Sequence, residues 1–262
     1  MLSPEYPDFS EIHPFLFQLA EEASTRALKY FHSNIEVESK EDKTPVTVAD
    51  RDIENKIREN IIMRFPGHGI RGEEFPDHNK QAAIQWIIDP IDGTRSFISG
   101  IPFFSTLIGL LYNDNPVFGC LAIPCEKKIY TSNGQQLYLN NKLYQRTAEK
   151  KTLENSLLIT TDERDIYRLH PSLNYRKLTE QVSFVRTWGD GYGYAMILEN
   201  RAQLMLDPEL NPWDIIPLIP LLKAAGLATS ALNGKDPVTE ANILCGEKDL
   251  HHRALKILNS EE

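Results

Sequence analysis

The chain has 262 residues, of which 41% are hydrophobic and 25% charged, and its net charge is -9. This composition is ordinary for a globular protein with one large core, whereas the excess of carboxylates disfavours nucleic-acid binding, which uses clustered Lys and Arg. The apolar runs are interrupted too often for a membrane span, so we expect neither a nucleic acid nor a membrane as partner.

The first half is predicted to form two helices and a run of strands. Apolar positions at helical spacing indicate helices over about 9–32 and 48–65, the second stopped by Pro66-Gly67. A strand over 84–88 follows. Short strands separated by turns then favour an antiparallel meander, over about 103–112, 117–123, 128–131 and 136–139.

The second half is predicted to alternate between strands and helices, which implies stacked layers in an α/β protein. A division near Glu149–Asn155 is weakly indicated. Gly226 is expected to cap a helix. The strands are expected at about 156–160, 182–186, 203–206 and 243–245, and the helices at 192–198, 213–225 and 247–258.

The cysteines and the N-terminus predict a reduced, cytoplasmic protein. Cys120, Cys125 and Cys245 are odd in number and match neither a zinc knuckle nor a CxxC pair. No basic and apolar leader follows Met1. The seven histidines also lack the spacing of a zinc site, and His251-His252 are expected to be exposed to solvent.

The most informative segment is Asp89-Pro90-Ile91-Asp92-Gly93-Thr94, which follows the apolar Trp86-Ile87-Ile88. Two carboxylates at a strand end are hard ligands that suit Mg²⁺. Gly93 would let backbone N–H groups approach a phosphate, and Thr94 is a candidate helix N-cap. Asp, Pro and Gly are equally common in turns, so this segment alone is compatible with a plain Asp-rich turn.

Three further acidic segments have both a functional and a structural interpretation. Glu73 follows a short strand and a glycine, where an exposed loop is the ordinary outcome. Asp214, after Trp213, is also typical of the first turn of a helix. Asp50 precedes the second helix and is a candidate N-cap. Each alone is at least as compatible with structure as with function.

Taken together, Asp50, Glu73, the segment 89–94 and Trp213-Asp214 resemble the inositol monophosphatase superfamily in order and spacing. The resemblance runs from about the first helix to the last. It implies a five-layer α/β/α/β/α sandwich, formed by one domain of residues 1–262 with halves of about 1–150 and 151–262. It also implies a Mg²⁺-dependent phosphomonoesterase that hydrolyses a small phosphate ester, and a homodimer.

The resemblance implies two or three Mg²⁺ ions and a role for each acidic residue. The first ion would be held by Glu73, Asp89 and the Ile91 carbonyl, the second by Asp89, Asp92 and Asp214, and Glu73 would assist a third. Thr94 and Asp50 would orient and deprotonate the attacking water. The catalytic set is thus Asp50, Glu73 and Thr94, and the backbone N–H groups of Gly93, Thr94 and Arg95 would bind phosphate.

Substrate choice follows from three segments that are similar to the histidinol-phosphate phosphatase subgroup, at 92–100, 188–195 and 207–214. They imply hydrolysis of L-histidinol phosphate to L-histidinol, a step of histidine biosynthesis. Carboxylates favour the substrate ammonium, and the residues implied to line its pocket are Arg95, Asp190, Asp207 and Asn211.

Several alternatives stay open at this stage. Asp207 is equally suited to accept a sugar hydroxyl, as in inositol phosphatases. The second candidate substrate is therefore myo-inositol 1-phosphate or a broad range of small phosphate monoesters, and a bisphosphate nucleotide is the third. Tyr192 and Tyr194 are interpreted as helix packing residues. A non-catalytic protein of the same fold is disfavoured, because such a protein is expected to lose metal ligands and all six acidic and hydroxyl residues are present.

Overall fold

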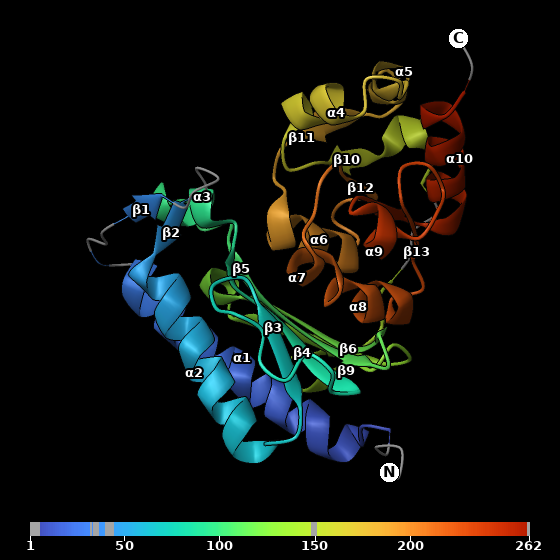
Figure 1. Cartoon of the computed structure of the whole chain (residues 1–262). Helices are drawn as coiled ribbons and strands as arrows, with labels where there is room; N and C mark the ends of the chain where they lie inside the picture. The colour runs from blue at the N-terminus through green and yellow to red at the C-terminus, as the bar shows by residue number, and fades with distance from the viewer. Residues whose placement is uncertain (1–5, 32, 34–36, 40–44, 148–150, 261–262) are drawn as a thin grey trace.

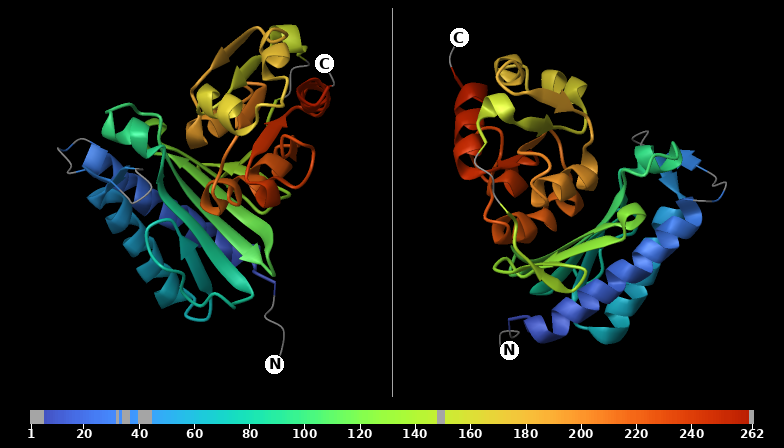
Figure 2. Two further views of the ribbon diagram at one scale, coloured as in Figure 1. Left: turned by 45° about the horizontal axis from the view of Figure 1, so that its top comes forward. Right: turned by 180° about the vertical axis from the view of Figure 1, so that it is seen from behind.

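The computed structural model describes residues 6–31, 33, 37–39, 45–147 and 151–260. Helices α1 (Phe9–Phe31) and α2 (Val48–Arg64) lie side by side along one face of a large sheet (Figures 1 and 2). Both helices were predicted, and α1 buries apolar side chains every three or four residues toward that sheet. Residue 32, where α1 was expected to end, lies outside the described residues.

The large sheet has seven strands in the order β3-β4-β5-β6-β7-β8-β9. Within this sheet β3 runs parallel to its neighbour β4, and the remaining pairs are antiparallel. Strands β5 to β8 form the predicted meander, and β9 extends it by a strand that was not predicted. The strands are β3 (Gly69–Gly72), β4 (Ile84–Asp92), β5 (Ser105–Tyr112), β6 (Asn115–Ile123), β7 (Lys128–Ser132), β8 (Leu137–Leu139) and β9 (Lys142–Tyr144).

The second sheet has the order β11-β10-β12-β14-β13, with β10 parallel to both of its neighbours. Its strands are β10 (Leu157–Ile159), β11 (Phe184–Arg186), β12 (Leu204–Asp207), β13 (Ala228–Ser230) and β14 (Ile243–Gly246). Shorter elements elsewhere are β1 (Val37–Ser39), β2 (Pro45–Thr47), α3 (Thr94–Ile98), α9 (Pro237–Glu240) and the 3-10 turns Pro124–Glu126 and Leu153–Asn155.

The helix expected over 213–225 is two helices, α7 (Pro212–Ile215) and α8 (Leu218–Ala224). Pro217 has no N–H to continue the first helix and occupies the N-cap of the second. Gly226, which follows the C-cap Ala225 of α8, has a φ of +75°, as expected of a helix stop. The remaining helices are α4 (Glu163–Leu169), α5 (Tyr175–Thr179), α6 (Asp190–Leu198) and α10 (Lys248–Leu258).

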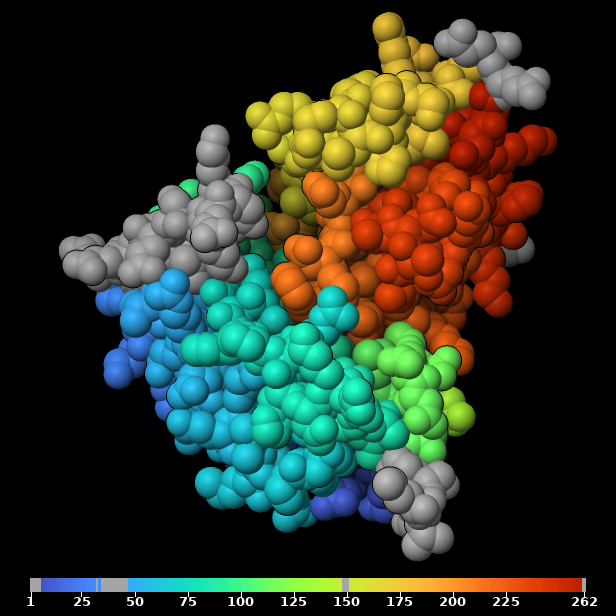
Figure 3. Space-filling model, viewed as in Figure 1, coloured from blue at the N-terminus to red at the C-terminus, as the bar shows by residue number. Residues whose placement is uncertain are grey.

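The elements stack in five layers, α/β/α/β/α, which confirms the expected fold class (Figure 1). Helices α6, α7 and α8 lie between the two sheets, and α4, α5 and α10 cover the outer face of the second sheet. Apolar cores fill each interface. The first half (blue to green) and the second half (yellow to red) are in direct contact in the space-filling view (Figure 3).

The structure corrects the expected exposure of His251 and does not describe the whole of the predicted division. His251 is not exposed to solvent: it is buried on α10 and its Nε2 lies 2.9 Å from the Ser230 hydroxyl oxygen. The weak division near 149–155 begins outside the described residues. Among the described helices, none is long and apolar enough to cross a membrane.

Gly119 of β6 tests the packing of the first sheet on α8. A Cβ at this position would collide with the backbone carbonyl oxygen of Pro217, which cannot rotate away. We expect Gly119→Ala to lower the free energy of unfolding by about 1–3 kcal/mol through overpacking. Urea denaturation measures this, with Gly67→Ala as control because that site has open space. Equal stability of both variants would contradict the packing.

Candidate active site

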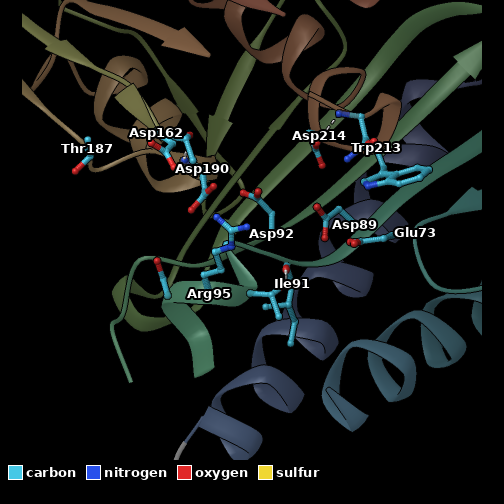
Figure 4. A pocket seen from close by; sticks show the side chains of 15 residues that line it. Glu73, Asp89, Ile91, Asp92, Arg95, Asp162, Thr187, Asp190, Trp213 and Asp214 are labelled. Atoms are coloured by element: carbon cyan, nitrogen blue, oxygen red, sulfur yellow. Dashed lines mark hydrogen bonds between the residues drawn. The ribbon is translucent and has the colours of Figure 1, made fainter. Parts of the chain in front are cut away.

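The two aspartates of the segment 89–94 lie in a strand, not in an exposed turn. β4 continues through Asp92, and its pairing with β5 shifts register between Asp89 and Asp92. Such a bulge bends the strand and redirects side chains. It places one carboxylate oxygen of Asp89, one of Asp92 and one of Asp214 within 4.8 Å of one another. Asp214 reaches this point from α7 (Figure 4).

The three carboxylates are crowded; Asp89 is buried, and Asp92 and Asp214 are partly buried. Asp89 is 2% exposed and its Oδ1 has no hydrogen-bond partner among the described residues. Burial, and then the charges of Glu73 and Asp92, hold the pKa of Asp89 well above its usual range. Burial also raises the pKa of Asp92 to about 6 and that of Asp214 to about 7.

This donor set fits a divalent cation. Oxygen ligands with several like charges suit Mg²⁺, and the unpartnered Asp89 Oδ1 is an oxygen still open to a ligand. Asp92 Oδ2 is held in place by the Ser105 hydroxyl at 2.6 Å and by the Gly191 backbone N–H. These two hydrogen bonds fix the orientation of the Asp92 carboxylate toward the cluster.

Glu73 and Ile91 border the same site. Glu73 follows β3, and its backbone N–H donates to the Ile88 carbonyl at 3.2 Å, which keeps it beside β4. Both residues line the pocket, and Figure 4 shows the Glu73 carboxylate next to that of Asp89. All five expected metal ligands thus lie at one place.

Gly93, not Thr94, is the N-cap of α3, which corrects the expectation from sequence. Gly93 has a φ of +82°, a conformation that glycine adopts without strain. Thr94 is the first helical residue, and its hydroxyl donates to the Ile91 carbonyl at 3.0 Å. Gly93, Thr94 and Arg95 all line the pocket at the start of this helix.

Asp50 is likewise not an N-cap. Thr47 caps α2, and Asp50 completes a capping box as the third helical residue. Its Oδ2 accepts from the Thr47 backbone N–H and hydroxyl, while its buried Oδ1 has no partner among the described residues. Burial raises the pKa of Asp50 to about 6. Asp50 makes no direct hydrogen bond to Thr94, although β2, which leads into α2, contacts α3.

Of the four expected substrate contacts, the pocket contains Arg95, Asp190 and Asn211. Figure 4 shows Arg95 reaching toward the space between Asp92 and Asp190. Burial, followed by the charge of Asp92, raises the pKa of Asp190 well above its usual range.

Asp207 lies outside the pocket lining, with both carboxylate oxygens engaged. It accepts from the Thr161 N–H at 3.0 Å and from the Tyr194 hydroxyl at 2.7 Å. The Thr161 hydroxyl in turn accepts from the Asp190 N–H at 2.9 Å. Asp207 and Tyr194 therefore support the wall that carries Asp190.

Five lining residues had no predicted role. The pocket has a volume of about 350 Å³, and these residues are Ser96, Thr161, Asp162, Thr187 and Trp213. Thr161 and Asp162 follow the predicted strand 156–160, and Thr187 follows 182–186. Because β10 and β11 are parallel, their carboxyl ends meet at one edge. The residues that follow these two predicted strands could therefore have been expected to lie together at that edge of the sheet.

The fold and this site define a phosphoric monoester hydrolase built as a layered α/β sandwich around an acidic centre. The chain belongs to the inositol monophosphatase family, whose model matches residues 8–262. This family acts on small phosphate monoesters and is generally Mg²⁺-dependent.

Individual relatives carry different names. A histidinol-phosphatase of Chlorobaculum parvum is 34% identical over 91% of this chain and 92% of its own length. A fructose-1,6-bisphosphatase/inositol-1-monophosphatase of Aquifex aeolicus is 28% identical over 84% of each chain. The solved extragenic suppressor protein suhB of Bartonella henselae superposes with a TM-score of 0.88 at 22% identity, over 96% of this chain and 99% of that one.

Proposed function

We propose that this phosphatase uses Mg²⁺ to hydrolyse L-histidinol phosphate to L-histidinol and phosphate. The observation that carries the proposal is the division of the pocket into two acidic parts. One part is the crowded cluster of Asp89, Asp92 and Asp214. The other is the wall with Asp162 and Asp190, on the opposite side of Arg95 (Figure 4).

In this proposal the first part binds the metal and the phosphate. Two or three Mg²⁺ ions would be held by Glu73, Asp89, the Ile91 carbonyl, Asp92 and Asp214. When bound, Mg²⁺ neutralises phosphate charge, acidifies water and stabilises the leaving alkoxide.

The residues around the start of α3 position the reactants. Backbone N–H groups of Gly93, Thr94 and Arg95 bind the phosphate oxygens, since they are the unpaired donors of a helix start. Thr94 lines the pocket and would orient the attacking water. Asp50 lies outside the pocket lining, and its buried Oδ1, which has no partner among the described residues, would accept the proton of that water. Glu73, which lines the same pocket, would assist by holding a metal ion there. No covalent intermediate is needed, so hydrolysis proceeds by direct in-line attack.

The second part selects the leaving group. Histidinol phosphate carries an ammonium and an imidazole. The ammonium would donate a charge-assisted hydrogen bond to the Asp190 carboxylate, which favours binding of this substrate. Asn211 and Arg95 complete this wall, and Asp207 acts behind it by holding Thr161. The similarity to the Chlorobaculum parvum histidinol-phosphatase supports this choice.

The second candidate substrate is myo-inositol 1-phosphate. It is favoured by the hydroxyls of Thr161 and Thr187, which line the same wall and can both donate to and accept from the hydroxyls of inositol. For either substrate, we propose one domain spanning residues 1–262 and a homodimer. The three cysteines are free thiols, which supports a cytoplasmic location.

A substrate panel tests this proposal. With Mg²⁺, we expect kcat/KM to be at least roughly tenfold higher for histidinol phosphate than for inositol 1-phosphate, the size of one charge-assisted hydrogen bond. Asp190→Asn should remove that preference by raising KM for histidinol phosphate alone. Asn suits this site because Asp190 has a φ of +52°, which Asn tolerates. A preference of the wild-type enzyme for inositol 1-phosphate would overturn the assignment.

A further inference from the structure

Glu54 is a buried carboxylate that has no role in the proposed reaction, either as a metal ligand or as a substrate contact. It lies on α2, one turn after Asp50, and is 0% exposed. Its Oε1 accepts from the Arg58 Nε at 2.7 Å, and its Oε2 accepts from the Glu74 backbone N–H at 2.7 Å. A side chain of this type is almost never fully buried unless it is paired, so the surroundings of Glu54 need an explanation.

Arg58 extends this contact along the loop after β3. Its Nη1 donates to the Pro76 carbonyl and its Nη2 to the Phe75 carbonyl, both at 3.0 Å. Its guanidinium also lies 5.7 Å from the centre of the Phe75 ring. Together, Glu54 and Arg58 bind three consecutive backbone groups, those of Glu74, Phe75 and Pro76.

The other side of Glu73 is held by the same carboxylate. A Cβ on Gly72 would collide with both oxygens of Glu54, so the end of β3 packs directly on this side chain. Glu54 therefore contacts the residue before Glu73 and the residue after it. Glu73 itself lines the pocket beside Asp89.

We propose that the Glu54–Arg58 pair is a positioning device that holds Glu73 at the metal site and so sets the affinity for Mg²⁺. The inference rests on the proposed function. A buried ion pair is a poor source of stability compared with apolar side chains. The pair does, however, satisfy one backbone N–H and two carbonyls of the loop at once. Its main contribution is therefore to the geometry of this loop.

The test measures the dissociation constant of Mg²⁺ for folded variants by titration calorimetry, in the absence of substrate. Glu54→Gln keeps the shape of the side chain but removes its charge, and we expect Mg²⁺ affinity to fall by roughly 10–100-fold, as for other residues that orient metal ligands. At saturating Mg²⁺, KM for the substrate should stay within about twofold, since the phosphate and leaving-group contacts are intact. Arg58→Lys keeps the charge but not the carbonyl contacts, and should give a smaller loss.

The matched control is Glu59→Gln on the same helix, where Glu59 is exposed and pairs with Lys56. It should bind Mg²⁺ like the wild type. If Glu54→Gln does so too, the inference is wrong while the proposed function stands. A wild-type protein that binds no Mg²⁺ would overturn both.

Hydrogen exchange of the wild-type protein gives a second measurement that needs no variant. By linkage, an ion that binds through Glu73 must stabilise the loop that carries it. Saturating Mg²⁺ should therefore slow hydrogen exchange of the Glu74 amide by at least roughly tenfold relative to the amides of α10. A tenfold change corresponds to about 1.4 kcal/mol in the free energy of the local opening that exposes the amide. Unchanged exchange at Glu74 in the presence of bound Mg²⁺ would contradict the inference.

Discussion

Asp92→Asn is expected to lower Mg²⁺-dependent kcat/KM by roughly 10²–10³-fold, the loss typical of one group that stabilises charge in the transition state. The substitution removes one negative charge from the acidic cluster and presents an amide to the cation. It should not unfold the protein, because burial, followed by repulsion from neighbouring carboxylates, already raises the pKa of Asp92 to about 6. Steady-state kinetics and thermal unfolding in chelator measure the two effects separately.

The control for this variant is Asp249→Asn, an exposed acid in the first turn of α10. It makes the same chemical change outside the cluster, and its activity should match the wild type. If Asp92→Asn kept full Mg²⁺-dependent activity, the proposal that the segment 89–94 binds the metal would be wrong. Lower activity with a melting temperature in chelator equal to or above that of the wild type would support it.

Much of the first half could be predicted from sequence because its periodicities are local. The buried face of α1 recurs every three to four residues, and the strands of the meander follow one another through short turns. The bulge in β4 could not be predicted, because Asp-Pro-Ile-Asp-Gly also satisfies the rules for a turn. The long-range pairing of Asp89 and Asp92 with β5 keeps those residues in a strand, whereas β3 pairs only with the residues before them.

In the candidate site, too, residues with a specific local sequence pattern were predicted, whereas residues brought together by long-range strand pairing were not. The acidic residues were found because their order along the chain is specific. Thr161, Asp162 and Thr187 were not found, because they meet only when Leu157–Ile159 pairs with Phe184–Arg186 in parallel. Asp207 was expected in the pocket, but a partner 46 residues away in sequence, Thr161, and a second from α6, Tyr194, occupy its oxygens.

Removal of Mg²⁺ is expected to abolish activity and to lower the melting temperature, by an amount that grows with pH. In the folded protein the pKa values of Asp92 and Asp214 are about 6 and 7, above the ordinary 3.8. The folded state therefore binds protons more tightly than the unfolded chain, and the metal-free protein loses stability as pH rises from about 4 to 7. Mg²⁺ replaces those protons, so its stabilising effect should be small at pH 5 and large at pH 8.

At 100 times the dissociation constant, Mg²⁺ should add about 2.7 kcal/mol at pH 8, which corresponds to roughly 5–10 °C for a chain of this size. Thermal unfolding with Mg²⁺ and with chelator at both pH values measures this. Ionic strength is matched with NaCl, because general screening also weakens repulsion among carboxylates. Asp92→Asn removes one of the repelling charges and should show a smaller Mg²⁺ shift. An equal shift at pH 5 and pH 8 would mean that protons and Mg²⁺ do not compete for these carboxylates, which would place the ion elsewhere.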